Sequence, residues 1–260
     1  KTARPPVIIL VAPQLGENIG QAARAMANFG LSELRLVNPR DGWPSEKAEA
    51  AASGAGDVIA AAQVFPTLEA AIADLTYVAA TTARIREMVK PVLSPETAVR
   101  LMAAKSEDGE RCGVLFGRER SGLENDEVAL ASSLVIAPVN PAFASLNLAQ
   151  AVLLIGYEWR KWVAGDSLGR ATTFDGPARE GLYINKSVPA TKGELLAFFQ
   201  HLETELEEGS FFKTDDKRSS VVRNIRNMFE RAALTEQEVR TLRGMIVALT
   251  GLRRTRHRVE

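Results

Sequence analysis

Residues 113–123 read Gly-Val-Leu-Phe-Gly-Arg-Glu-Arg-Ser-Gly-Leu. An apolar run ends abruptly there in an Arg-Glu-Arg triplet that lies between Gly117 and Gly122. Gly117 allows a close backbone approach, and Gly122 lets the chain turn into a following helix. A strand that ends in such a loop is typical of the carboxyl edge of an open α/β sheet, where ligands bind. The loop is either part of a binding site or a surface cluster of ion pairs.

Further apolar runs on both sides of this stretch predict a mostly parallel sheet. They are short, rich in β-branched residues and often apolar throughout, as expected for strands that helices cover on both faces. The predicted strands span residues 7–12, 33–37, 77–82, 113–116 and 134–139. Predicted helices lie between them or follow them, over residues 18–29, 46–62, 95–104, 123–131 and 145–163. The first part of the chain is therefore predicted to be an α/β domain with helices on both faces of the sheet.

Composition divides the chain into three parts. Residues 1–165 carry the α/β pattern, and residues 166–189 are rich in Gly, Ser, Thr, Pro and Asn, which predicts a linker. Residues 190–260 show three amphipathic helical patterns, which predict a small all-α extension. The 32 basic and 32 acidic residues cancel, but 12 basic and 5 acidic residues lie between 213 and 258. A neutral protein with one basic end is expected to meet a polyanion there.

Capping boxes mark the helix starts in the C-terminal part. The motifs Thr191-x-x-Glu194 and Thr235-x-x-Glu238 each stand directly before an apolar helical pattern. In such a motif the threonine and the glutamate satisfy each other's free backbone N–H groups. The first and third helices of this part are therefore predicted to begin at these residues.

Composition also excludes several classes of protein. With 46% hydrophobic and 25% charged residues the chain is expected to be globular, and no apolar stretch approaches the roughly 20 residues of a membrane span. Cys112 is the only cysteine, so no internal disulfide forms, and it is expected to be a core residue rather than a nucleophile. With only His201 and His257 beside it, a structural zinc site is excluded. No metal is expected, and the chain is predicted to be cytoplasmic.

The common fingerprints of nucleotide and nucleophile chemistry are absent. No G-x-G-x-x-G follows a predicted strand, and the chain has neither a G-x-x-x-x-G-K-[ST] phosphate loop nor a G-x-S-x-G elbow. These absences disfavour hydride transfer, ATP hydrolysis and catalysis by a serine nucleophile.

Two more stretches combine a predicted strand end with polar residues. In Asn18-Ile-Gly-Gln-Ala-Ala-Arg24, Asn18 is expected to cap the helix that begins there, and Arg24 to lie on its polar stripe. In residues 140–147, small residues lead to Ser145 and Asn147 at the start of a long helix, with Ser145 as the expected cap. The plain interpretation is two caps and a solvated arginine. The alternative is that these groups bind a phosphate or a ribose.

A fourth strand end carries two hydroxyl groups and a cation, in Thr81-Thr82-Ala83-Arg84. Because the carboxyl ends of parallel strands meet at one edge of a sheet, four such ends predict a single ligand crevice. Each signal is weak alone, and their combination carries the prediction.

In this combination the chain resembles the SpoU (TrmH-like) branch of the SPOUT methyltransferases. The motifs, in chain order, are Asn18-Ile-Gly-x-Ala-Ala-Arg24-Ala-Met, Leu-Phe-Gly117-Arg-Glu119-Arg-x-Gly-Leu and Asn140-Pro-x-x-x-Ser145-Leu-Asn147-Leu-Ala. They span most of residues 7–165. The pattern from Pro189-Ala-Thr to Leu242-Arg-Gly-Met is similar to the helical extension of TrmJ-type tRNA methyltransferases.

The resemblance implies a fold, a reaction and a set of site residues. It implies a homodimer whose subunits each contain a deep trefoil knot. It also implies transfer of a methyl group from S-adenosylmethionine to a ribose 2′-hydroxyl, with S-adenosylhomocysteine as product, at position 32 of the tRNA anticodon loop. The implied cofactor-binding residues are Thr81, Thr82, Ala83, Gly117, Ala137, Ala144, Ser145 and Leu146. The implied catalytic residues are Asn18, Arg24, Glu119, Ser145 and Asn147.

Basic residues outside this set are expected to hold RNA phosphates. They are Arg84, Arg223, Arg226, Arg253 and Arg254. Two roles stay open for Arg24, as the base that accepts the hydroxyl proton or as a fixed cation that holds a phosphate, because a guanidinium is charged at any ordinary pH. Cytidine and uridine both remain possible targets.

Three rival interpretations remain. The first is another knotted RNA methyltransferase, which acts on ribosomal RNA ribose or on a base nitrogen. The second is an RNA-binding module without activity. The third is a nucleotide-binding α/β protein unrelated to RNA. The intact set of motif residues disfavours the second interpretation. The basic helical end and the missing phosphate fingerprints disfavour the third.

Overall fold

The computed structural model describes residues 3–84, 88–165, 167–169, 178–180, 187–212 and 215–256. The chain forms two compact units, Lys1–Leu168 and Gly169–Glu260. Each is described by itself below, as unit 1 and unit 2.

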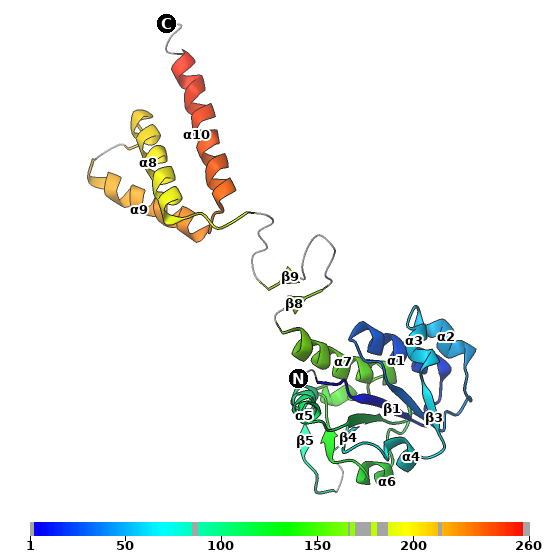
Figure 1. The fold of residues 1–260 in the computed structure, drawn as a ribbon. Coiled ribbons are helices and arrows are strands. Elements are labelled where there is room, and N and C mark those ends of the chain that lie inside the picture. The colour runs from blue at the N-terminus through cyan, green and yellow to red at the C-terminus, as the bar shows by residue number, and fades with distance from the viewer. Residues whose placement is uncertain are drawn as a thin grey trace. The chain divides into compact units, whose positions relative to one another are not determined.

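Unit 1 is built on a seven-stranded sheet with the strand order β3-β2-β1-β6-β4-β7-β5 (Figure 1). The strands are β1 (Val7–Val11), β2 (Leu34–Val37), β3 (Gln63–Phe65), β4 (Tyr77–Thr81), β5 (Val92–Leu93), β6 (Cys112–Phe116) and β7 (Ser133–Val135). Every pairing between them is parallel. The carboxyl ends of β1, β6, β4 and β7 therefore lie side by side at one edge.

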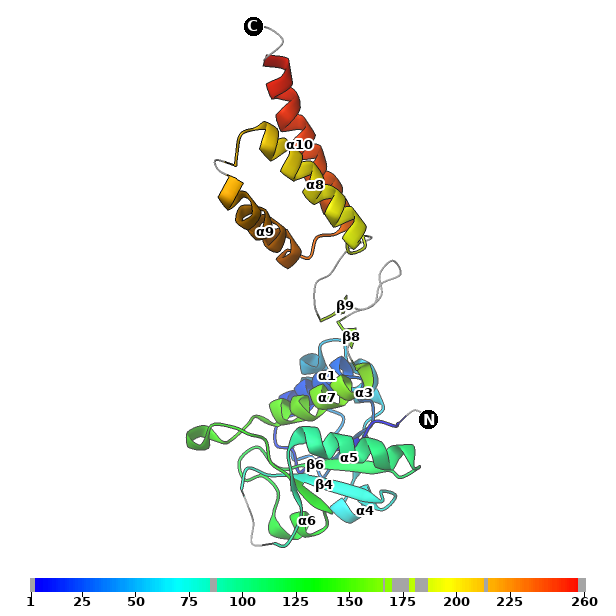
Figure 2. The same cartoon turned by 90° about the vertical axis from the view of Figure 1, so that its left-hand side faces the viewer.

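Helices cover both faces of this sheet (Figures 1 and 2). The helices are α1 (Gly16–Asn28), α2 (Glu46–Ala52), α3 (Gly56–Ala60), α4 (Leu68–Ile72), α5 (Pro95–Glu107), α6 (Asn125–Ala129), the short 3₁₀ helix η1 (Pro141–Phe143) and α7 (Leu148–Ala164). α1, α2, α3, α5 and α7 share one apolar cluster, and α4 and α6 belong to a second. The prediction of a parallel sheet between two helical layers is confirmed. The trefoil knot stays a prediction.

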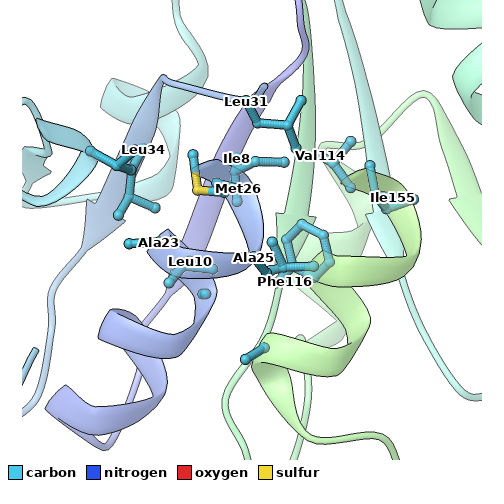
Figure 3. Close-up of a cluster of buried hydrophobic side chains, with 14 of the residues drawn as sticks. Ile8, Leu10, Ala23, Ala25, Met26, Leu31, Leu34, Val114, Phe116 and Ile155 are labelled. Atoms are coloured by element: carbon cyan, nitrogen blue, oxygen red, sulfur yellow. The ribbon is translucent and has the colours of Figure 1, made fainter. Parts of the chain in front are cut away.

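Alternate strand residues divide between these two clusters. Ile8 and Leu10 of β1 pack toward α1 and α7, whereas Ile9 belongs to the cluster on the other face. Figure 3 shows the first cluster, in which Met26 of α1 and Ile155 of α7 lie close to side chains of the strands. Because successive side chains of a strand point to opposite faces, a strand buried on both faces must be apolar at every position. Strands β1 and β6 show this pattern, whereas β2 also carries the buried Arg35.

Several predicted boundaries in unit 1 are wrong. The single helix predicted over residues 46–62 is two helices, since Ser53 and Gly54 both have a positive φ, which ends α2 and starts a turn. The strand predicted over 134–139 ends at Val135. The short elements β3, β5 and α4 were not predicted, because two to five residues give too little periodicity to detect.

The two predicted caps in unit 1 are also wrong. Asn18 lies inside α1, whose N-cap is Leu15, a residue without a capping side chain. Asn147, not Ser145, caps α7, with its side-chain oxygen accepting from the N–H of Ala149 at 2.9 Å. The side chains of Asn18 and Asn147 also bond to each other, as part of the site.

Unit 2 contains three helices, α8 (Lys192–Glu208), α9 (Asp215–Arg231) and α10 (Glu236–Arg256). The predicted capping boxes are confirmed, because the hydroxyls of Thr191 and Thr235 accept from the N–H groups three residues on. A small core of Phe198, Phe199 and Val239 joins the helices. Two short strands, β8 (Ser167–Leu168) and β9 (Ala178–Arg179), lie in the segment predicted as a linker. Among the described helices, none is long and apolar enough to cross a membrane.

Candidate active site

A cavity of about 340 Å³ lies in unit 1 at the carboxyl ends of β4, β6 and β7. Its volume falls in the range of about 300–1,000 Å³ that small-molecule sites occupy. All eight residues expected to bind a cofactor line it: Thr81, Thr82, Ala83, Gly117, Ala137, Ala144, Ser145 and Leu146. The structure therefore brings three separate segments of the chain to one cavity. This cavity lies at the carboxyl edge of the sheet, where the sequence predicted a ligand crevice.

The walls of the cavity offer mainly apolar surface and backbone groups. The Thr81 hydroxyl donates to the carbonyl of Leu115 at 2.8 Å, and the Thr82 hydroxyl donates to the carbonyl of Arg84 at 3.0 Å. Leu154 and Ile155 of α7 add aliphatic surface. The two threonine hydroxyls are already engaged, so a ligand at residues 81–82 and at α7 meets mainly backbone groups and apolar side chains, while the loop after β6 adds charged side chains. Sequence reasoning missed the α7 residues, which resemble any other core positions of an amphipathic helix.

The loop that follows β6 is held in one conformation. The backbones of Arg118 and Gly122 bond to each other in both directions, at 3.2 and 2.9 Å. A Cβ at Gly117 would lie 2.2 Å from the backbone of Gly122 and Leu123, so only glycine fits there. The Arg118 guanidinium makes two hydrogen bonds of 3.0 Å to Glu127, whose carboxylate raises the pKa of Arg118. The loop is thus fixed by its own backbone and by an ion pair to α6.

A chain of hydrogen bonds joins the three sequence motifs that contain Asn18, Glu119 and Asn147. Glu119 accepts from the backbone N–H groups of Gln14 and Leu15, at 2.8 and 3.2 Å. The side-chain amide of Asn18 donates to Glu119 at 3.0 Å, and that of Asn147 donates to the Asn18 oxygen at 3.1 Å. Glu119 therefore satisfies two backbone N–H groups directly before the first turn of α1, a helix without a capping side chain of its own, although it lies more than 100 residues away in the chain.

The remaining catalytic candidates lie at different places. Ser145 is exposed and lines the cavity. Arg24 is exposed on α1, it is not among the lining residues, and within the described ranges it has no hydrogen-bond or ion-pair partner. The structure therefore brings Asn18, Glu119 and Asn147 into direct contact beside the cavity, and leaves Arg24 outside it.

The arginines predicted to bind RNA phosphates also differ in their surroundings. Arg84 is exposed and lines the cavity, and Arg223 is exposed on α9. Arg226 makes two hydrogen bonds of 2.7 and 2.9 Å to Glu203, which raises the pKa of Arg226. Its guanidinium is therefore occupied in holding α9 against α8. The side chains of Arg253 and Arg254 lie outside the described residues.

Cys112 and metal ligands play no visible part in this site. Cys112 is buried, its thiol contacts the carbonyl of Met102, and burial raises its pKa to about 11. A thiol with so high a pKa is a poor nucleophile. Over the described part of the chain, no group of three or more His, Cys, Asp or Glu side chains could hold a metal ion.

Comparisons with known proteins agree with this geometry. Residues 5–157 match the SpoU rRNA Methylase family, and residues 193–259 match the family described as the C-terminal domain of tRNA methyltransferase TrmJ. The chain is 36% identical over 240 residues to the tRNA (cytidine/uridine/adenosine-2′-O-)-methyltransferase TrmJ of Pseudomonas aeruginosa, covering 92% of this chain and 91% of that protein.

One further relative and one solved structure also match nearly the whole chain. The tRNA (cytidine/uridine-2′-O-)-methyltransferase TrmJ of Klebsiella pneumoniae is 36% identical over 243 residues, 93% of this chain and 95% of that protein. The crystal structure of TrmJ from Z. mobilis ZM4 superposes with a TM-score of 0.79 at 45% identity, and covers 95% of this chain and 99% of that one. The similarity thus extends over both units.

Proposed function

Because the chain belongs to the SpoU rRNA Methylase family, we propose that it transfers a methyl group from S-adenosylmethionine to a ribose 2′-hydroxyl of tRNA. The observation that carries this proposal is the match over both units to relatives named as tRNA 2′-O-methyltransferases. The target that we infer is the cytidine or uridine at position 32 of the anticodon loop, as the TrmJ-type pattern implies. A tRNA substrate also favours a cytoplasmic enzyme.

The cavity fits the cofactor in volume and in chemistry. Its aliphatic walls suit an adenine ring, and backbone groups of the lining residues 83 and 144–146 suit the polar edge of that ring. When bound, S-adenosylmethionine supplies an electrophilic methyl group on a sulfonium centre. The protein's task is then to exclude water and to hold the ribose oxygen in line with that methyl group.

The contacts between Asn18, Glu119 and Asn147 suit a positioning role. Asn18 is buried and bonds on both sides, so its orientation is fixed by its neighbours. Asn147 is exposed at the start of α7, close in sequence to Ser145 on the cavity wall. We expect the side chains of Asn18 and Asn147 to orient the ribose. Glu119 would hold the α1 segment against the loop after β6.

We infer that Arg24 acts at the cavity of a second copy of the chain, since it does not line the cavity of its own subunit. It lies on α1, which packs against α7, where the Phe29 and Tyr157 rings meet edge to face at 6.1 Å. Leu153 and Tyr157, one turn apart on α7, are 41% and 49% exposed. We expect this apolar surface to meet the same surface of a partner in a homodimer, which would bring Arg24 to the partner's cavity. There it either accepts the hydroxyl proton or holds a phosphate.

Unit 2 offers a polar face for the tRNA backbone. Exposed side chains on one side of α9 are Lys217, Ser220, Arg223, Asn224, Asn227 and Arg231. At 100° per residue they cover about 120° of the helix. Glu230 is the only acidic residue between 217 and 231, and it pairs with Lys192. This face replaces the predicted Arg226, whose charge is occupied by Glu203, and the cations on it are expected to pair with phosphates.

The test is methyl transfer to unmodified tRNA with a tritium-labelled donor, followed by mass spectrometry of the nucleosides. The expected result is a 2′-O-methyl group at position 32. Transfer to ribosomal RNA but not to tRNA would assign the enzyme to another target. Binding of tRNA without any transfer would leave only an RNA-binding module, and would overturn the proposal.

A further inference from the structure

One charged side chain of the loop after β6 makes no hydrogen bond or ion pair within the described part of the chain. Arg118 is bound to Glu127, and Glu119 is bound to α1. Arg120, between Glu119 and Ser121, is exposed and lines the cavity, and no hydrogen bond or ion pair engages its guanidinium in the part of the chain that the structure describes. A charged side chain that the fold does not use, at the wall of a ligand cavity, indicates a contact with a ligand.

The loop presents Arg120 in a fixed position. The two backbone bonds between Arg118 and Gly122 close a turn of five residues, and Arg120 is the middle one. Gly117 packs against the backbone on the far side of this turn, and Glu119 ties it to α1. Little backbone freedom is left to lose on binding, so the ordering cost of an ion pair made by Arg120 is confined to its side chain.

Charge at the cavity favours an anion as the partner. Among the residues that the structure describes, four charged ones line it: Arg84, Arg118, Glu119 and Arg120. Arg118 and Glu119 are engaged within the fold, so the charges left for a ligand are the two positive ones, on Arg84 and Arg120. A guanidinium is a planar fork that matches the paired oxygens of a phosphate or a carboxylate.

We propose that Arg120 binds a backbone phosphate of the RNA strand next to the nucleotide that is methylated. The inference rests on the methyl-transfer function proposed above and adds a substrate-binding residue to it. Two molecules bring paired anionic oxygens to this cavity, the RNA through its phosphates and S-adenosylmethionine through its carboxylate. The exposure of Arg120 at the middle of the loop favours the RNA, which approaches from solvent, over the cofactor carboxylate.

The experiment compares Arg120→Gln and Arg120→Lys with Arg4→Gln in the full-length protein. Arg4 is also exposed, but it stands before the amino end of β1, at the opposite edge of the sheet from the cavity. For each variant, tRNA binding is measured at several salt concentrations, the cofactor dissociation constant by calorimetry, the KM and kcat for tRNA by methyl transfer, and the fold by thermal unfolding.

For Arg120→Gln we expect tRNA binding to weaken about tenfold to a hundredfold, as for the loss of one charge-assisted hydrogen bond. The KM for tRNA should rise more than kcat falls, and the slope of log K against log salt should become shallower by about 0.7. Arg120→Lys keeps the charge and should retain the slope while losing part of the affinity. Cofactor affinity, thermal unfolding and all properties of Arg4→Gln should stay as in the wild type.

Two results would overturn the inference. Equal tRNA affinity and salt slope in Arg120→Gln and Arg4→Gln would show that Arg120 contacts no phosphate. Weaker cofactor binding with unchanged tRNA binding would assign Arg120 to the carboxylate instead. Failure of the wild type to methylate tRNA would refute the proposed reaction, while the binding comparison, which needs no turnover, would still decide on Arg120.

Discussion

The side-chain amide of Asn147 donates a hydrogen bond to the side-chain oxygen of Asn18, 3.1 Å away, although 129 residues of chain separate them. Asn18 donates in turn to Glu119 at 3.0 Å. An asparagine that both donates and accepts in this way fixes the orientation of its amide, because a rotated amide would place two like groups against each other. The start of α1, the loop after β6 and the start of α7 are thereby held together beside the cavity.

Replacing Asn18 tests this connection. Asn18→Asp puts an oxygen in place of the amide nitrogen and sets two carboxylates against each other, so the free energy of unfolding should fall by about 1–3 kcal/mol. Methyl transfer should fall as well. Gln21→Glu makes the same amide-to-carboxylate change at an exposed position of α1 and should cost little. Equal thermal unfolding of the two variants would show that the bond to Glu119 contributes nothing.

Removal of the Arg24 side chain should separate activity from stability. Since Arg24 is exposed and has no partner in the described ranges, Arg24→Ala should change the free energy of unfolding by less than about 0.5 kcal/mol. Cofactor affinity should stay near normal, while methyl transfer should fall about 10²–10⁴-fold if Arg24 acts in proton transfer. Calorimetry and a single-turnover assay measure the two quantities. Retained turnover would remove Arg24 from the mechanism.

A methyl group at Gly117 should damage the cavity. The added Cβ would lie 2.2 Å from the backbone of Gly122 and Leu123, so the loop must move, and we expect Gly117→Ala to cost about 1–3 kcal/mol and to weaken cofactor binding. Gly56→Ala is the control, because nothing lies within 4 Å of its added Cβ. It should be neutral or slightly stabilising. Normal cofactor affinity in Gly117→Ala would mean that the loop can relax without affecting the cavity.

The polar face of α9 should carry salt-dependent affinity for tRNA. The triple variant Lys217→Gln, Arg223→Gln and Arg231→Gln removes three exposed cations, and filter binding should show a salt slope shallower by about 2–3. Cofactor affinity should not change. Arg240→Gln on α10 removes a cation that already pairs with Glu236, and it should bind tRNA nearly as well as the wild type. An unchanged slope in the triple variant would exclude this face as the RNA contact.

An ion-pair cluster on unit 1 predicts the response to acid. The buried guanidinium of Arg35 hydrogen-bonds to Asp74 and lowers the pKa of Asp74 from 3.8 to about 2. Because the folded chain holds this carboxylate ionised more tightly than the unfolded chain does, the stabilisation is complete above pH 3.8 and is lost as the pH falls toward 2. Asp74→Asn should be less stable at neutral pH and should lose less stability across that window. Parallel acid unfolding curves would contradict this assignment.

The sequence by itself determined the fold class and the composition of the site. Strands that are apolar at every position, such as 7–11 and 112–116, need cover on both faces, and helices between them make the sheet parallel. The Thr191 and Thr235 capping boxes were readable because each motif acts within one helical turn. The polar residues after the strands also predicted where the cavity lies.

Only the tertiary structure decided how those residues are used. Asn18 and Ser145 both resembled caps, but the cap of α7 is Asn147, and the backbone at the start of α1 is satisfied by Glu119. The sequence predicted Arg226 as an RNA contact, and the structure pairs its guanidinium with Glu203. Hydrogen bonds and ion pairs between residues far apart in the chain follow from how the elements pack, which no local pattern of sequence records. The same reason explains why Arg118 and Arg120 differ. Arg118 is bound to Glu127, whereas the Arg120 guanidinium has no partner among the described residues.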